Sequence, residues 1–135
     1  MHIIICLDER RGLLFNHRRQ SKDRELIADV GRNLTGSLFI KPYSEPLFAG
    51  REIPYRCVER VEDAIGENSV FFAEDLDFLS VLDSVDTVTV YWWNRHYPSD
   101  VRLETDLLAE GFTSVCREDF VGFSHENITK EILKR

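Results

Sequence analysis

A short basic stretch near the start of the chain carries the side chains best suited to binding. Residues 16–24 hold four Lys or Arg side chains and a histidine, in a protein with a formal net charge of −7. The candidate ligand-binding residues in this stretch are Asn16, His17, Arg18, Arg19, Lys22 and Arg24. Guanidinium groups and a helix N-terminus both favour an anion such as a phosphate or a carboxylate. The alternative is a solvated loop whose cations pair with surface carboxylates.

A second candidate surface is aromatic. Tyr91, Trp92 and Trp93 follow one another and are succeeded by Arg95 and His96, a combination that suits stacking of a flat ring. Neighbouring residues of a strand point to opposite faces, so one tryptophan meets a ligand, a covering helix or a second copy in a homodimer. We retain Trp92 and Trp93 as candidate ligand-binding residues; the alternative is that both are ordinary core aromatics.

Asp23 is the one candidate for catalysis. It lies at the start of a predicted helix for which Ser21 is a candidate N-cap. The apolar positions of that helix, at helical spacing, are Leu26, Ile27, Val30 and Leu34. A carboxylate there could donate a proton or anchor a protonated heterocycle. The alternative is that Asp23 only caps the helix, so no catalytic residue is assigned.

Composition and spacing exclude several classes of protein. The four histidines are isolated, and no Cys/His pair has ligand spacing, so no metal site is expected. The net negative charge disfavours an extended nucleic acid as partner. No apolar run is long enough to cross a membrane. The three cysteines are widely spaced, and Cys6 and Cys116 lie in apolar runs as small buried hydrophobes. We therefore expect no disulfide, no signal peptide and a cytoplasmic location.

The elements that must position these residues follow from hydrophobic patterning. Strands are predicted over His2–Leu7, Ser37–Ile40, Tyr55–Val58, Ser69–Ala73, Asp86–Trp93, Phe112–Cys116 and Phe120–Phe123. Helical turns are predicted over Asp75–Leu82 and Leu103–Leu108, whereas Asn127–Arg135 suits either a helix or an edge strand. This order predicts one α/β domain over residues 1–135. Its single sheet is mixed and mostly parallel, with antiparallel C-terminal strands and helices on both faces.

Laid end to end, these pieces resemble dihydrofolate reductase over nearly the whole chain. The residues that carry the resemblance are Ile3–Leu7, Asp8, Gly12, Asn16, the helix containing Asp23, Tyr43–Phe48, Ser69–Leu82, Val88–Trp93, Asp100–Leu103 and Phe112–Arg135. The resemblance implies a dihydrofolate reductase-like fold. It also places Asp23 near the pocket carboxylate of that family.

Departures from the family pattern fall on its cofactor and substrate sites. Ala73-Glu74 stands where the family has a Gly-Gly pair, and Lys41-Pro42 stands where it has Gly-Arg. Without glycine the backbone cannot approach a pyrophosphate closely, and Glu74 adds repulsion. The run His17–Gln20 replaces the family's Pro-Trp, and Trp92 or Trp93 replaces a small polar pocket residue. NADPH is therefore disfavoured, and no cofactor is expected.

We expect a catalytically silent protein of degenerate dihydrofolate reductase-like fold. It would bind a small anionic or nucleotide-like ligand, or a protein partner, through residues 16–24 and the aromatic strand. One alternative is an NADPH-dependent reductase with an altered cofactor site and Asp23 as proton relay. Another is a nucleotide- or RNA-processing protein that uses Arg18, Arg19 and Lys22.

Overall fold

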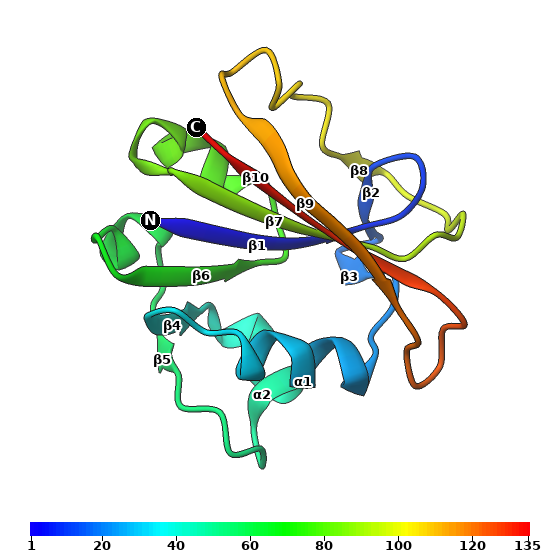
Figure 1. Ribbon diagram of the computed structural model, residues 1–135. Helices are drawn as coiled ribbons and strands as arrows, with labels where there is room; N and C mark the ends of the chain where they lie inside the picture. Colours follow the sequence, from blue (N-terminus) through cyan, green and yellow to red (C-terminus); the bar gives the residue numbers. More distant parts are fainter.

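The computed structural model describes residues 1–135, and its main feature is a sheet of seven strands. The strand order is β5-β4-β6-β1-β7-β10-β9 (Figure 1). Its strands are β1 (His2–Leu7), β4 (Ser37–Ile40), β5 (Arg56–Cys57), β6 (Ser69–Ala73), β7 (Thr87–Trp92), β9 (Thr113–Phe120) and β10 (Ile128–Lys134). Strands β5, β4, β6, β1 and β7 run parallel, and β10 is antiparallel to both β7 and β9. The expected mixed, mostly parallel α/β fold is confirmed.

The central strands are buried on both faces, which explains their continuous apolar sequences. Along β1, Ile3 and Ile5 point into one core, whereas Ile4 points into the other. Strand β6 does the same, with Phe71 in the first core and Phe72 in the second. This alternation fixes the register of the sheet, because a shift by one residue would exchange the two faces.

The α-helices lie on one face of the sheet only (Figure 1). They are α1 (Arg24–Arg32) and the short α2 (Glu45–Phe48), which follows the 3-10 helix η1 (Pro42–Ser44). The other face is covered by the 3-10 helices η2 (Val61–Ala64) and η3 (Asp77–Ser84) and by the segment before β9. Helices therefore lie on both faces, but those on the second face are 3-10 helices only. The helix predicted over Asp75–Leu82 is η3, whereas Leu103–Leu108 is not helical and only its last two residues enter a turn.

A second, small antiparallel sheet contradicts the prediction of a single sheet. Its order is β3 (Arg18–Arg19), β2 (Gly12–Phe15) and β8 (Val101–Arg102). The two residues between β2 and β3, Asn16 and His17, both have positive φ angles, as in a tight type I′ hairpin. The basic stretch therefore begins as a hairpin and ends as the first turn of α1.

The C-terminal part also differs from expectation. Within residues 127–135, Ile128–Lys134 form β10, which lies between β7 and β9 rather than at the edge. In place of the strands predicted over Phe112–Cys116 and Phe120–Phe123 there is one strand, β9, which ends at Phe120, forms the sheet edge and is exposed over almost its whole length. Residues 121–123 lie in the turn that follows. Cys116 is therefore exposed and Cys6 only half-buried, contrary to the expectation of two buried thiols. No helix in the structure has the length and hydrophobicity to cross a bilayer.

Candidate functional site

Asp23 is the centre of a hydrogen-bonded cluster at the carboxyl end of the central strands. It caps α1, accepting hydrogen bonds from the backbone N–H of Glu25 at 2.9 Å and of Leu26 at 3.4 Å. The backbone N–H groups of Phe123 and Ser124, in the turn between β9 and β10, donate to its two oxygens at 2.9 Å each. The cap is thus Asp23 and not the predicted Ser21, and one carboxylate ties the turn to the helix.

The charged form of Asp23 is strongly favoured. Burial alone would raise the pKa of this carboxyl group, which is only 3% exposed. The hydrogen bonds from Phe123, His125 and Ser124 outweigh burial and hold the pKa well below its usual range. A carboxylate held in this way is a poor proton donor and a good anchor.

His125 connects Asp23 to two hydroxyl groups. Its Nδ1 lies 2.9 Å from Asp23 Oδ2, and its Nε2 lies 3.0 Å from both Ser21 Oγ and Tyr97 Oη. The ring is 4% exposed and stacks on Trp93 with centroids 4.6 Å apart. Because Asp23 is an acceptor only, the neutral ring carries its proton on Nδ1, so Nε2 can accept a hydroxyl proton.

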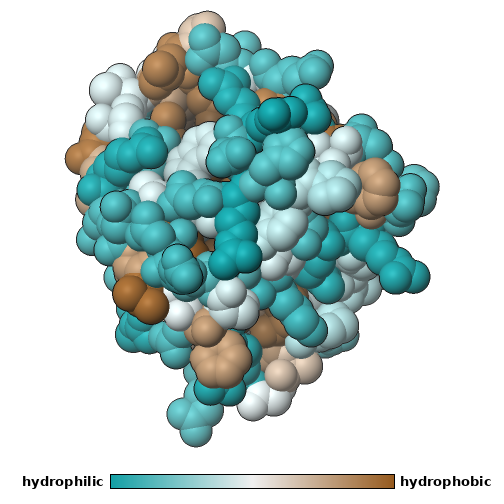
Figure 2. Space-filling view, turned by 90° about the vertical axis from the view of Figure 1, so that its right-hand side faces the viewer, coloured by the Kyte–Doolittle hydropathy of each residue, from teal (hydrophilic) through white to brown (hydrophobic).

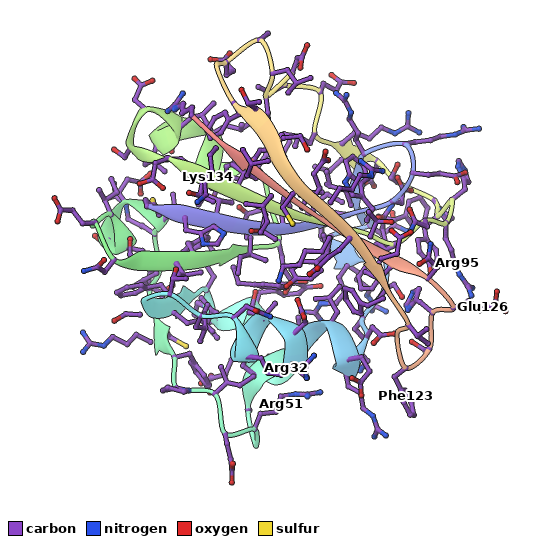
Figure 3. The ribbon with its side chains drawn as sticks, in the orientation of Figure 1. Arg32, Arg51, Arg95, Phe123, Glu126 and Lys134 are labelled. Atoms are coloured by element: carbon purple, nitrogen blue, oxygen red, sulfur yellow. The ribbon has the colours of Figure 1, made fainter.

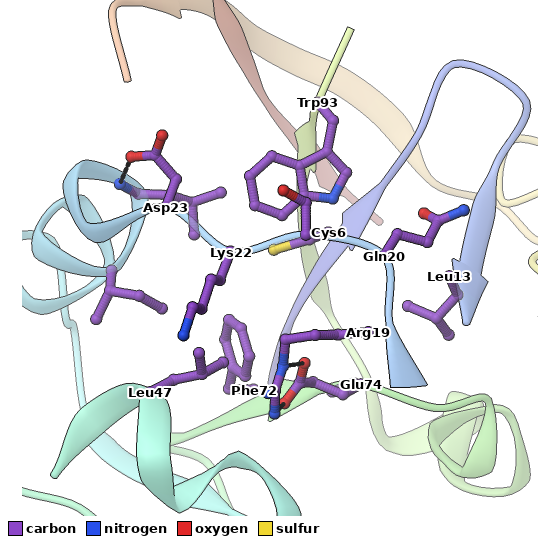
Figure 4. A pocket seen from close by; sticks show the side chains of 14 residues that line it. Cys6, Leu13, Arg19, Gln20, Lys22, Asp23, Leu47, Phe72, Glu74 and Trp93 are labelled. Atoms are coloured by element: carbon purple, nitrogen blue, oxygen red, sulfur yellow. Dashed lines mark hydrogen bonds and ion pairs between the residues drawn. The ribbon is translucent and has the colours of Figure 1, made fainter. Parts of the chain in front are cut away.

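Beside this cluster lies a cavity of about 20 Å³, room for about one water molecule. Side chains from three central elements close it: Cys6 from β1, Phe72 from β6 and Trp93 after β7 (Figure 4). Lys22 projects into the space between Asp23 and Arg19 (Figure 4). This side of the sheet, between Asp23 and Trp93, is therefore largely filled by the protein's own side chains.

Arg19 closes the other end of the cavity by a two-pronged ion pair with Glu74 (Figure 4). Its Nε and Nη2 donate to the two carboxylate oxygens at 2.7 and 2.9 Å, and Ser44 Oγ donates to the same carboxylate at 2.8 Å. The hydrogen bond with Glu74 raises the pKa of Arg19. Nearby, Lys41 pairs with Asp75 and Asp77. Both cations at the ends of β3 and β4 are thus neutralised internally.

A larger groove, of about 380 Å³, opens on the other side of Lys22 between α1 and α2. Its lining combines cations with apolar side chains and consists of Arg19, Lys22, Asp23, Arg24, Ile27, Pro46, Leu47, Arg51, Phe123 and Ser124. The labelled Arg51 and Phe123 lie on the same side of the sheet as α1 (Figure 3). The only carboxylate in the lining is Asp23, which is already saturated with hydrogen bonds.

Three cations of this groove have no carboxylate partner. Lys22, Arg24 and Arg51 take part in none of the ion pairs of the chain. The Arg24 guanidinium lies 3.7 Å from the Phe123 ring centroid, and Arg51 Nε donates to the backbone oxygen of Leu47 at 3.1 Å. Two of the cations are thereby held in place without being neutralised, which is the arrangement an anionic ligand needs.

The remaining candidate residues lie elsewhere. Asn16, His17 and Arg18 are exposed on the β2–β3 hairpin, outside the groove. Trp93 lies in the α1-side core, whereas Trp92 packs on the opposite face, where Nε1 donates to Glu131 at 3.2 Å. The two tryptophans therefore do not share a site, as their adjacency on a strand predicts.

Sequence reasoning missed the members of the site that come from distant segments. Arg51 and His125 each stand alone in sequence, and no local pattern marks them. Phe123 ends a predicted strand and Tyr97 closes the aromatic run of residues 91–97, but neither pattern places its side chain at this site. His125 reaches Ser21 across 104 positions, a contact that only the fold creates.

The surface around the site is mainly hydrophilic. Figure 2 looks onto the side of the molecule that carries the loops between strands, and its hydrophobic patches are separate rather than continuous. No three His, Cys, Asp or Glu side chains gather closely enough to hold a metal ion. Comparison with models of known families and with curated proteins gives no match for this chain.

Proposed function

We propose that this chain binds a small organic anion in the groove between α1 and α2, without folate-reductase activity. The observation that carries the proposal is the set of three unpaired cations, Lys22, Arg24 and Arg51, around one groove of an acidic protein. In a chain with an excess of carboxylates, cations that stay unpaired are available to a ligand.

The lining suggests the chemical class of the ligand. Ile27, Pro46, Leu47 and Phe123 supply apolar contact area beside the cations. A carboxylate or phosphate attached to a compact apolar or aromatic body satisfies both parts of the groove. A nucleotide belongs to this class; inorganic phosphate satisfies only the cationic part.

Several features argue against a reductase within the proposed dihydrofolate reductase-like family. Glu74 engages Arg19 and Ser44 at the end of β6, so this position offers a pyrophosphate neither a glycine backbone nor a free cation. The cavity beside Asp23 holds about one water, which leaves no room for a pteridine-sized ring. Asp23 itself is held as an anion and is a poor proton relay.

The other hypotheses receive less support. A nucleic-acid role for Arg18, Arg19 and Lys22 requires the three to act together, yet Arg19 is paired with Glu74 and Arg18 lies on the hairpin. All three cysteines are free, which is compatible with the proposed reducing, cytoplasmic compartment. A protein partner would have to present its own carboxylate or phosphate to the same groove.

Titration tests the proposal. The full chain is titrated with 4-aminobenzoate, adenosine monophosphate, NADPH and inorganic phosphate, with tryptophan fluorescence and melting temperature as readouts. We expect an organic anion to bind and the double variant K22Q/R51Q to bind about 100-fold more weakly, tenfold for each cation removed.

R18Q is the matched control, because Arg18 belongs to the same basic stretch but lies outside the groove. It should bind like the wild type. No binding of any organic anion by the wild type, or equal losses in R18Q and K22Q/R51Q, would overturn the proposal. Tight NADPH binding would instead favour the reductase alternative.

A further inference from the structure

We propose that Ser21, His125 and Asp23 form a nucleophilic triad that hydrolyses esters of short carboxylic acids. The three side chains form an unbroken chain of hydrogen bonds, from Asp23 Oδ2 to His125 Nδ1 at 2.9 Å and from His125 Nε2 to Ser21 Oγ at 3.0 Å. A serine, a histidine base and a carboxylate that orients the base are the parts of a serine hydrolase, which is recognised by geometry rather than by sequence order.

The environment of each member suits its role. Asp23 remains charged and fixes the Nδ1–H tautomer, which leaves Nε2 free to take the proton of Ser21. Trp93 stacks on the imidazole and, with Asp23, holds its orientation. In these terms Ser21 and His125 are the catalytic residues, and Asp23 is a positioning residue.

The candidate donor for the oxyanion is a backbone N–H next to Ser21. The backbone N–H of Lys22 makes no hydrogen bond within the chain. In α/β hydrolases the oxyanion hole uses the N–H of the residue after the nucleophile, and Lys22 holds that position here. The Lys22 ammonium group, which is also unpaired, adds positive charge nearby.

The reaction balances with water as the only co-reactant. Ser21 Oγ bonds to the ester carbonyl carbon while its proton moves to His125 Nε2; the ester C–O bond then breaks, and the leaving alcohol takes that proton. Water next attacks the acyl-serine, giving its proton to Nε2, and Ser21 recovers a proton as the carboxylic acid leaves.

The space around Ser21 sets the size of the acyl group. The adjoining cavity of about 20 Å³ has room for little more than the methyl group of an acetyl, so the alcohol part must extend toward the groove. A preference for esters of anionic alcohols rests on the proposed function, because it uses the same cations. The triad itself does not depend on that preference.

The effect of removing the Tyr97 hydroxyl distinguishes a catalytic triad from a purely structural cluster. Its hydroxyl lies at the same 3.0 Å from Nε2 as Ser21 Oγ, and a neutral imidazole nitrogen accepts one well-aligned hydrogen bond at a time. Without the Tyr97 hydroxyl, Nε2 should accept a hydrogen bond from Ser21 alone. The reactivity of Ser21 should therefore stay the same or increase. A structural cluster would only lose stability.

The test uses 4-nitrophenyl acetate, a neutral ester that needs none of the groove cations. Release of 4-nitrophenolate and the mass of the intact chain are followed, and the acetylated peptide is treated with hydroxylamine. We expect one acetyl group on Ser21, labile to hydroxylamine because it is an ester. S21A should lower the rate by about 100-fold, and Y97F should keep or exceed the wild-type rate.

Two further variants keep the result interpretable. S84A is the matched control, because Ser84 is an exposed serine at the end of η3, outside both the triad and the groove, and it should remain active. S21C retains a nucleophile and should be acetylated on sulfur even where S21A is unstable. Three results would overturn the triad: no acetylation, acetylation of Lys22 that is stable to hydroxylamine, or acetylation that S21A does not change. The variant K22Q/R51Q tests the groove separately.

Discussion

Two groups of cations lie side by side on this molecule, and only one of them is neutralised. Arg19 and Lys41 are paired with Glu74, Asp75 and Asp77. Lys22, Arg24 and Arg51 line the neighbouring groove without any carboxylate partner. We refer to these sets as the paired group and the free group.

The difference shows that positive charge in a sequence does not by itself indicate a binding site. Arg19 and Lys22 are three positions apart and were equal candidates, yet Arg19 is engaged by Glu74 and Lys22 is not. The paired group stabilises the fold by closing the ends of β3, β4 and β6. The free group makes no such stabilising contact, so we infer that its cations serve to bind an anionic ligand.

The largest expected effect concerns Asp23, the only carboxylate that lines the groove of the free group. D23N should lower the free energy of unfolding by about 3 kcal/mol at neutral pH, because several buried donors lose a charged acceptor. Urea unfolding from pH 7 to pH 2 measures this loss.

The pH dependence of that loss has a definite sign. The pKa of Asp23 is depressed in the folded state, so its stabilisation is fully present above the unfolded pKa of about 4 and is lost as pH falls toward the folded value. The difference between wild type and D23N should therefore shrink below about pH 4. If the difference in unfolding free energy between wild type and D23N did not change with pH, Asp23 would stabilise the fold by its shape and not by its charge.

A smaller effect is expected for the paired group. E74Q removes the charge that Arg19 and Ser44 share, and we expect a loss of about 2 kcal/mol, because both partners are mostly buried. E67Q, at an exposed carboxylate without an ion pair, should change stability by less than about 0.5 kcal/mol. Equal unfolding midpoints for E74Q and E67Q would contradict the distinction between the groups.

The smallest effect is expected for the free group. K22Q/R51Q should leave stability unchanged within about 0.5 kcal/mol, or raise it slightly at low salt by relieving repulsion between cations. Thermal unfolding at low and high salt measures this. A clear loss of stability would mean that these cations support the fold, which would weaken the case for a ligand.

The sequence was most informative for the central strands, whose residues are nearly all apolar. The isoleucines of β1 and the phenylalanines of β6 predicted central strands, because a continuous apolar run suits a strand buried on both faces. Residues 127–135 stayed ambiguous because Ile128, Ile132 and Leu133 fit two periods, and only pairing with β7 and β9 decides between them.

The site was predictable only in part. The basic stretch predicts Lys22 and Arg24, and the start of the first predicted helix predicts Asp23. His125, Tyr97 and Arg51 were missed because each reaches the site through long-range packing. The ion pair joins Arg19, a candidate for binding an anion, to Glu74, a candidate for repelling one, and no local pattern indicates that they neutralise each other.

The exposed edge strand β9 has a consequence for the behaviour of this protein at high concentration. An open strand offers unpaired backbone groups that can recruit another molecule and begin aggregation. Here Arg117, Glu118 and Asp119 place three successive charges on that edge, and the register shift opposite Ile132 and Leu133 disturbs its regularity. The strand thus carries its own protection against ordered self-association, without any covering element.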